Sequence, residues 1–375
     1  MPEDSAEALA IDGGTPLRTA AWPEPPAVAP AEDIAPLAAL ESEFAAALGL
    51  AASAVVAYRD HAAAFDAAFA TLTPLPGHDE AVIPALLGEA LAAAARRNGW
   101  RPVPAEVEPD AATLSARGLA RAIGPATGIV GLAHSFGHPP VLADIVRVAQ
   151  EAAAAVIEDA SDGFGAAYRD EAVGRFGRAV FALGAGRVLS GGAPDRTSGG
   201  GLLVLRDPAL AETARTARDA SGGALDEAAA RGTLAELRRS GEELLARRQL
   251  AWDLTFGLRG VRGLASMTQG RWIRHAYDRY VVRLRAVVWK RSLEDTIAAI
   301  RAEGIPCEAA AGPPLYLDPA VREALPGDER LGDDHFPAAG RLSGELVAFP
   351  LHGGLTSKDM DQVAAVLRKV ERWST

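Results

Sequence analysis

Two short apolar runs, Gly128-Ile129-Val130-Gly131-Leu132 and Ala155-Val156-Ile157, are separated by a longer stretch with helical spacing of its apolar residues. The same alternation begins earlier, with Ala81-Val82-Ile83 and Val103-Pro104-Ala105-Glu106-Val107 ahead of further alanine-rich stretches. Short buried strands that alternate with helices are typical of βαβ units, which assemble into a mostly parallel sheet. We therefore expect an α/β protein in which helices cover a mostly parallel sheet.

A second region is expected beyond this sheet. The run Leu202-Leu203-Val204-Leu205 reads as one more buried strand, and a long helical stretch from Leu225 to Leu258 follows it. Farther on, the sequence predicts a strand at Tyr280-Val281-Val282-Arg283-Leu284 and a helix near Leu293 to Glu303. A C-terminal helix is expected after Thr356-Ser357-Lys358-Asp359, which carries an N-cap signal.

These elements divide the chain into three parts. Residues 1–30 are rich in Pro, Ala and Gly, which favours an extended N-terminal arm. Residues 31–260 form the predicted large α/β domain, and residues 261–375 form a smaller C-terminal α+β domain.

Composition and charge exclude several classes of function. The chain has 375 residues, of which 49% are hydrophobic, so it can bury a sizeable core. Its formal net charge of -11 argues against nucleic-acid or membrane-surface partners, because both attract basic proteins. Cys307 is the only cysteine, which excludes an internal disulfide, and no apolar run approaches the ~20 residues of a spanning helix. We expect a cytoplasmic protein.

Four ordered segments carry a resemblance to a known family. They are Leu9-Ala10-Ile11-Asp12-Gly13-Gly14-Thr15-Pro16, Val156-Ile157-Glu158-Asp159-Ala160, Val173-Gly174-Arg175-Phe176-Gly177 and Phe349-Pro350-Leu351-His352-Gly353-Gly354-Leu355-Thr356. Together they resemble the DegT/StrS family of sugar aminotransferases. The resemblance implies the fold-type I architecture of pyridoxal phosphate (PLP) enzymes, and a dimer.

The family's chemistry needs a lysine that bonds covalently to the cofactor and a carboxylate that holds the pyridine nitrogen. Asp159 matches the carboxylate. Arg187 stands at the position of the lysine, and a guanidinium stays protonated and cannot be the amine nucleophile. The chain has only three lysines; Lys290 lies in the small domain, while Lys358 and Lys369 are expected as solvated charges on a surface helix.

Other positions also depart from the family. Asp60 falls where the family has a donor-rich turn for the cofactor phosphate, and like charges disfavour that contact. Gly88 replaces the aromatic residue that stacks on the pyridine ring, and Asp162 replaces a glutamine. Arg231 replaces the asparagine that reaches across the dimer to the neighbouring phosphate. These departures predict a degenerate family member with no bound cofactor.

The former cofactor pocket remains polar. His61 and Asp159 are candidates for acid/base chemistry, with Arg187 as an anion anchor. The alternative is an ion-pair network that fills an inactive site. No metal is expected, because His134 and His138 fall in a loop and not on one helix face. The other expected pocket residues are Arg59, Asp60, His134, Asp162, Ser190 and Arg231.

Two functions follow from this interpretation. The favoured one is a protein of bacterial sugar or natural-product biosynthesis that has lost PLP binding and transamination. It would act as a non-catalytic or partner subunit, either as a homodimer or as a heterodimer with an active homologue. The alternative is a PLP-independent enzyme that uses His61, Asp159 and Arg187 on a small polar substrate.

Overall fold

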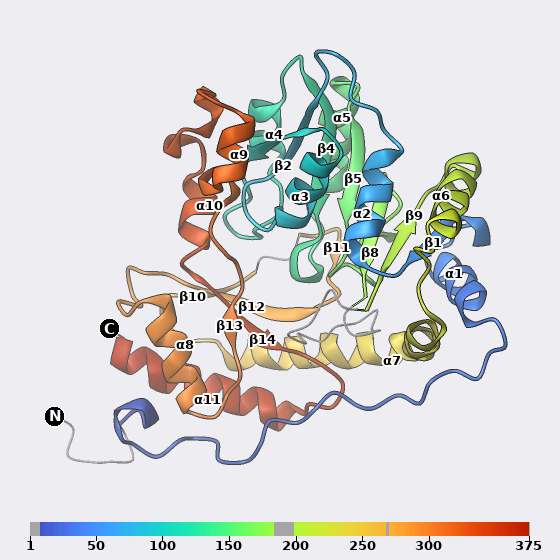
Figure 1. The fold of residues 1–375 in the computed structure, drawn as a ribbon. Helices are drawn as coiled ribbons and strands as arrows, with labels where there is room; N and C mark the ends of the chain where they lie inside the picture. Colours follow the sequence, from blue (N-terminus) through green and yellow to red (C-terminus); the bar gives the residue numbers. More distant parts are fainter. Residues whose placement is uncertain (1–7, 184–198, 268–269, 375) are drawn as a thin grey trace.

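A seven-stranded sheet forms the centre of the larger half of the molecule (Figure 1). The computed structural model describes residues 8–183, 199–267 and 270–374. The strand order is β1-β9-β8-β5-β4-β2-β3, with parallel pairing from β3 through β8 and antiparallel pairing of β9 with both β8 and β1. The strands are β1 (Val55–Tyr58), β2 (Glu80–Pro84), β3 (Arg101–Ala105), β4 (Thr127–Ala133), β5 (Ala155–Asp159), β8 (Arg178–Ala182) and β9 (Gly201–Val204). The predicted α/β class with a mostly parallel sheet is confirmed.

Helices cover both faces of this sheet because successive strand residues point to opposite sides. Val55 and Ala57 pack in one apolar cluster with α1, whereas Val56 and Tyr58 pack in another with α2, α3 and α6. Val130 packs with α4 and α5. The helices are α1 (Pro36–Ala47), α2 (His61–Ala70), α3 (Glu89–Arg97), α4 (Ala116–Ala122), α5 (Leu142–Glu151) and α6 (Pro208–Ala220).

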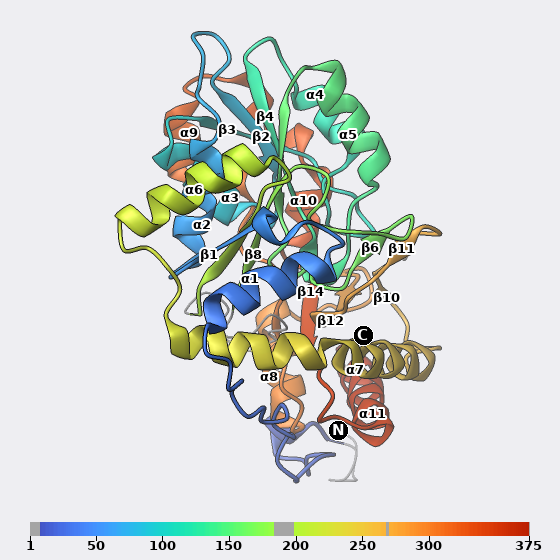
Figure 2. The same ribbon diagram turned by 90° about the vertical axis from the view of Figure 1, so that its right-hand side faces the viewer.

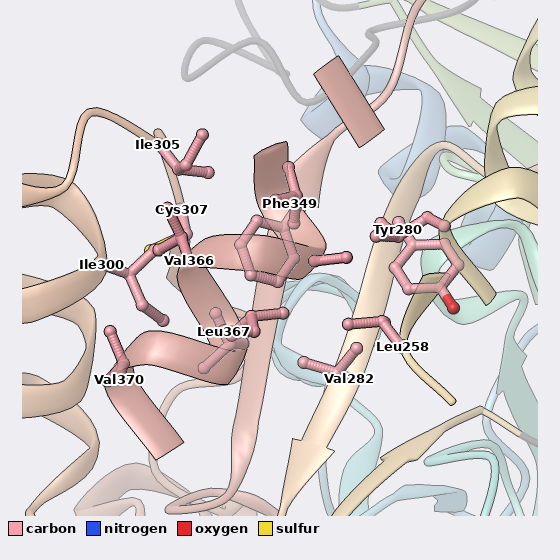
Figure 3. Packing of buried hydrophobic residues seen from close by; sticks show 14 of the residues in the cluster. Leu258, Tyr280, Val282, Ile300, Ile305, Cys307, Phe349, Val366, Leu367 and Val370 are labelled. Carbon is pink, nitrogen blue, oxygen red and sulfur yellow. The ribbon is translucent and has the colours of Figure 1, made fainter. Parts of the chain in front are cut away.

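A smaller antiparallel sheet with the order β10-β12-β14-β13 forms the other half. Its core lies between β12, β14, α8, α11 and the end of α7 (Figure 3), where Val282, Phe349 and Leu367 are fully or almost fully buried. The elements are α7 (Glu227–Gly257), β10 (Leu264–Ser266), β12 (Arg279–Leu284), α8 (Leu293–Ala302), β13 (Glu308–Ala309), α9 (Pro319–Ala324), α10 (Pro337–Leu342), β14 (Leu346–Pro350) and α11 (Ser357–Ser374). A third small sheet joins β11 (Ile273–Arg274), β6 (Ala167–Tyr168) and β7 (Glu171–Ala172).

The long helix α7 connects the two halves. Figure 2 shows it running beneath the large sheet, with α1 lying along it and α11 below its far end. The chain before α1 contains one short 3-10 helix, Ala10–Asp12, and otherwise follows the lower side of the molecule past α11 and α7 (Figure 1). The two halves are thus tied together by one continuous helix and by this segment.

The environment of Lys369 differs from the sequence-based expectation. The side chain was predicted to be solvated, but Lys369 is only 2% exposed. Its Nζ lies 2.8 Å from Oε1 of Glu303, which is fully buried, and donates a hydrogen bond to the carbonyl oxygen of Thr15. The prediction is wrong because Lys369 falls on the face of α11 that packs against α8, where a partner 66 residues away neutralises it.

Candidate active site

A cleft lies at the carboxyl ends of parallel strands β4 and β5. This edge of a parallel sheet is where open α/β folds usually bind ligands. The cavity has a volume of about 300 Å³. The polar side chains that line it are His61, Glu89, His134, Ser135, Asp159, Ser161, Asp162 and Arg279. The structure therefore brings together His61, His134, Asp159 and Asp162 from the predicted set.

Asp159 is the last residue of β5 and is half-buried in the cleft. One carboxylate oxygen accepts a hydrogen bond of 3.0 Å from the backbone N–H of Ser161. Burial raises the pKa of the Asp159 carboxyl above its usual value; hydrogen bonds from Ser161 oppose this shift, and the charge of Asp162 adds to it. A cationic group beside Asp159 would relieve the cost of keeping this carboxylate ionised.

His134 lines the cleft but has a structural partner. Its Nε2 lies 3.0 Å from Oε2 of Glu158, and both side chains are buried. Glu158 also accepts the backbone N–H groups of Gly174, Phe176 and Gly177. This carboxylate therefore connects the loop after β4 to the loop after β7, and it holds His134 in a fixed orientation.

Arg279 is a cleft residue that the sequence analysis missed. It lies on β12 of the smaller sheet, is 8% exposed, and places its guanidinium 5.0 Å from the ring centre of Phe136. Its Nη2 lies 3.5 Å from Oδ2 of Asp162, and its Nη1 donates to Glu308 at 3.0 Å. No local signal marks Arg279, because only the packing of β12 against the larger half brings it to the cleft.

Of the residues at the start of α2, one lines the cleft and two lie outside it. His61, the first residue of the helix, lines the cleft with its ring edge-on to Phe65. Asp60 caps the helix by accepting the N–H of Ala63 at 2.6 Å. Arg59 pairs with Asp60 at 3.4 Å, and both side chains are largely exposed. Arg59 and Asp60 thus lie outside the cavity lining, next to it.

Leu87 is a second cleft residue that was missed. It has φ of 63°, a conformation that side-chain-bearing residues rarely adopt, and it lines the cavity. The neighbouring Gly88 has no room for an aromatic side chain, because a Cβ there would lie 2.5 Å from the carbonyl oxygen of Pro84. Leu87 therefore supplies an apolar wall near the position where the family resemblance placed a stacking ring.

Arg231, one of the other predicted pocket residues, lies outside the cavity lining. The guanidinium of Arg231 donates to the carbonyl oxygens of Ala31 and Asp33, so it holds the segment before α1 in its own chain. Arg187 and Ser190 lie outside the described residues. The chain's lysines lie elsewhere too, since Lys290 and Lys358 are exposed and Lys369 is paired with Glu303.

Two features are absent from residues 8–183, 199–267 and 270–374. Within these ranges no group of three or more His, Cys, Asp or Glu side chains could hold a metal ion. No helix in the same ranges is long and apolar enough to cross a membrane.

The fold is that of PLP-dependent aminotransferases. An aminotransferase structure, TlmJ from Streptoalloteichus hindustanus, superposes with a TM-score of 0.78 at 26% identity and covers 92% of each chain. The structure of DesI with its TDP-sugar product also gives a TM-score of 0.78, at 22% identity, over 97% of this chain and 96% of that one. The sequence pattern of the DegT/DnrJ/EryC1/StrS aminotransferase family matches residues 35–368, so the chain belongs to this family.

Named relatives extend the comparison. The erythromycin biosynthesis sensory transduction protein EryC1 of Saccharopolyspora erythraea is 28% identical over 304 residues, which cover 77% of this chain and 78% of that protein. GDP-perosamine synthase of Caulobacter vibrioides is 28% identical over 319 residues, covering 79% and 80%. L-glutamine:2-deoxy-scyllo-inosose aminotransferase of Micromonospora echinospora is 28% identical over 234 residues, covering 56% and 53%.

These comparisons correct the predicted function. The chain was expected to have lost PLP binding and transamination, or to be a PLP-independent enzyme. The family it belongs to is an aminotransferase family, and proteins named as transaminases match most of its length. Both expectations are therefore wrong. The error came from equating the missing lysine with a missing cofactor, although a lysine provides only the covalent part of cofactor binding.

Proposed function

We propose that this chain transfers an amino group to a keto sugar or keto cyclitol in bacterial natural-product biosynthesis. The cofactor would be pyridoxal phosphate or its amine form, pyridoxamine phosphate, held without a covalent bond. The observation that carries the proposal is the half-buried carboxylate of Asp159 at the end of β5, inside a cleft of about 300 Å³. Membership of an aminotransferase family and the names of its relatives support it.

The pyridine end of the cofactor fits the cleft. Asp159 offers a desolvated carboxylate with a raised pKa, and a protonated pyridine nitrogen is the kind of partner that would restore its ionised form. Leu87 and Ala133 supply apolar walls within the same cavity. When bound, the cofactor's pyridinium ring supplies the electron sink that amino transfer requires.

The phosphate end of the cofactor fits the cleft less well than the pyridine end does. The first turn of α2 presents backbone N–H groups, which are favourable for an anion. The carboxylate of Asp60 already accepts one of them, the N–H of Ala63. Asp60 would have to turn toward solvent for a phosphate to use this N–H, and Arg59 beside it would offset part of the negative charge. The residues present therefore fit a cofactor that is weakly held at its phosphate.

Besides the two ends of the cofactor, the family's chemistry involves a lysine that bonds covalently to the cofactor, and amino transfer needs a group that carries a proton. No lysine of the chain lies in the cleft, so the amine form of the cofactor, which needs no bond to the protein, suits it best. Among the described residues, no carboxylate lies within ion-pair distance of His61, whereas Nε2 of His134 is bonded to Glu158. We assign proton transfer at the reacting carbon to a ring nitrogen of His61.

Replacing Asp159 by asparagine should weaken the binding of pyridoxamine phosphate at least about tenfold, because it removes the charge that faces the pyridinium; tenfold corresponds to about 1.4 kcal/mol. Isothermal titration calorimetry of the purified chain with pyridoxamine phosphate measures the effect. Asp144→Asn, which alters an exposed carboxylate on α5, is the matched control. Absence of binding to the wild-type chain at millimolar cofactor, or equal affinities of Asp159→Asn and wild type, contradicts the proposal.

Replacing Asp60 by serine should tighten cofactor binding about fivefold. The change removes a negative charge near the phosphate, worth about 1 kcal/mol at a separation of 4 Å in water. It keeps a good N-cap, since serine and aspartate cap helices about equally well. The same titration measures it, and Asp226→Ser, at the N-cap of α7, is the control. An unchanged affinity in Asp60→Ser would show that the phosphate does not bind at the start of α2.

Two structural proposals accompany this function. We propose that the chain forms a homodimer, as the family resemblance implies. We also propose that residues 31–260 and 261–375 act as the two units that flank the cleft, with residues 1–30 as the arm that joins them. The contact between Asp162 of the larger unit and Arg279 of the smaller one supports the second proposal.

A further inference from the structure

Glu89 is a cleft carboxylate to which the proposed function gives no task. It is the first residue of α3 and lines the cavity together with Asp159 and Asp162. The residue is exposed, so it lies where the cleft opens to solvent. An acidic residue in the first turn of a helix is favourable for the helix itself, but this does not require the side chain to line a cavity.

The carboxylate of Glu89 has no cationic partner. Within the described ranges no arginine, lysine or histidine forms an ion pair with it, and no cation contributes to the shift of its pKa. Partial burial raises the pKa of Glu89, hydrogen bonds from the backbone at Glu89 and Leu87 oppose this shift, and the charge of Asp159 adds to it. A cation that binds beside Glu89 would therefore stabilise its ionised form.

Arg279, the arginine in the described lining of the cleft, is already paired. Its Nη1 donates to Glu308 at 3.0 Å, and its Nη2 lies 3.5 Å from Oδ2 of Asp162. Its Nε lies 3.7 Å from Oδ2 of Asp278. Because three carboxylates share this one guanidinium, Arg279 neither neutralises Glu89 nor offers a free positive charge to an anionic substrate.

The cofactor does not neutralise Glu89 either. In the proposed function the pyridine nitrogen faces Asp159, and the phosphate faces the first turn of α2. Neither end is assigned to the first turn of α3. The negative charge of Glu89 is thus left for the substrate.

We propose that Glu89 determines substrate specificity by binding an ammonium group of the sugar or cyclitol that receives the amino group. The inference rests on the proposed function, since it names the substrate class of the same cleft. The substrate already carries one amino group when it enters. An ammonium group has three N–H donors, and a carboxylate accepts them through short, charge-assisted hydrogen bonds. The same carboxylate repels an acidic sugar.

Three hexoses of similar size and different charge test the proposal. They are D-glucosamine, which is largely cationic at neutral pH, neutral D-glucose, and anionic D-glucuronate. Each is titrated into the full chain and followed by ligand-observed NMR, with and without saturating pyridoxamine phosphate. Glucosamine should bind at least about tenfold more tightly than glucose, which is typical of a hydrogen bond between charged groups. Glucuronate should bind more weakly than glucose.

Two variants assign the preference to Glu89. Glu89→Gln keeps the shape of the side chain and removes its charge, so it should lower the affinity for glucosamine to that for glucose. The affinity for glucose itself should stay within about twofold, because no charge of the sugar is involved. Glu294→Gln is the matched control, since Glu294 is an exposed acidic residue in the first turn of α8 and lies outside the cleft lining. It should bind all three sugars as wild type does.

Four results would overturn the inference. They are no binding of any of the three sugars at tens of millimolar, equal affinities of the wild-type chain for glucosamine and glucose, a preference for glucosamine that persists in Glu89→Gln, and an equal loss in Glu294→Gln. Failure of the proposed function has a different signature. It appears as absence of pyridoxamine phosphate binding, while the titrations without cofactor still decide whether Glu89 binds the ammonium group.

Discussion

Replacing Glu158 by alanine should lower the free energy of unfolding by about 4 kcal/mol or more. The fully buried carboxylate accepts hydrogen bonds from His134 and from the backbone N–H groups of Gly174, Phe176 and Gly177, at 2.7 to 3.0 Å. Each buried donor left without a partner costs about 1–3 kcal/mol, and alanine leaves four of them. Urea unfolding followed by circular dichroism measures the loss.

The loop that Glu158 holds cannot easily find other partners. A Cβ at Gly177 would lie 2.4 Å from the carbonyl oxygen of Val156, so the loop packs directly on β5. Glu151→Ala is the matched control, because its carboxylate forms an exposed pair with Arg147 that contributes little. A loss below about 1 kcal/mol in Glu158→Ala would contradict this account of the loop.

Replacing Lys369 by methionine should destabilise the chain by about 3–5 kcal/mol, which is the usual cost of leaving a buried charge without its partner. Glu303 is fully buried and accepts the Nζ of Lys369 as well as the backbone N–H groups of Ala10 and Leu17. The same carboxylate therefore joins α8, α11 and the N-terminal segment. Urea unfolding measures the stability, and trypsin cleavage after Arg18 reports release of the segment.

Two further variants separate the effect of the lost charge at Lys369 on stability from the effect of lost packing. Lys358→Met, on an exposed lysine of the same helix, should change stability by less than about 0.5 kcal/mol. The double variant Lys369→Met, Glu303→Gln should recover part of the loss, because no buried charge is then unpaired. If the double variant is no more stable than Lys369→Met, the loss arises from packing around Lys369 and the electrostatic explanation fails.

Much of the fold was predictable from local periodicity. The apolar runs at 81–83 and 155–157 lie within β2 and β5, and the helical stretch at 225–258 corresponds to α7, Glu227–Gly257. These elements are recognisable because burial on one or both faces leaves a repeating pattern in the chain itself. Asp159 was also found from sequence, since it directly follows such a strand.

Other features depend on contacts between distant residues. Nothing local indicates that β9 runs antiparallel to β8, since strand direction depends on how the intervening chain crosses the sheet. Arg279 and Leu87 enter the cleft through packing of β12 and through an unusual backbone conformation. Lys369 looked like a surface charge because its partner, Glu303, lies at the C-terminal end of another helix, α8.

The sequence alone determined the fold class, the family and the carboxylate at the end of β5, because each depends on residues that are neighbours along the chain. Tertiary structure decided which charges are buried and paired and which polar side chains share a cavity. It brought Arg279 to Asp162 and Lys369 to Glu303. The energy of a charge depends on its distance to other charges and to solvent, and a linear pattern specifies neither.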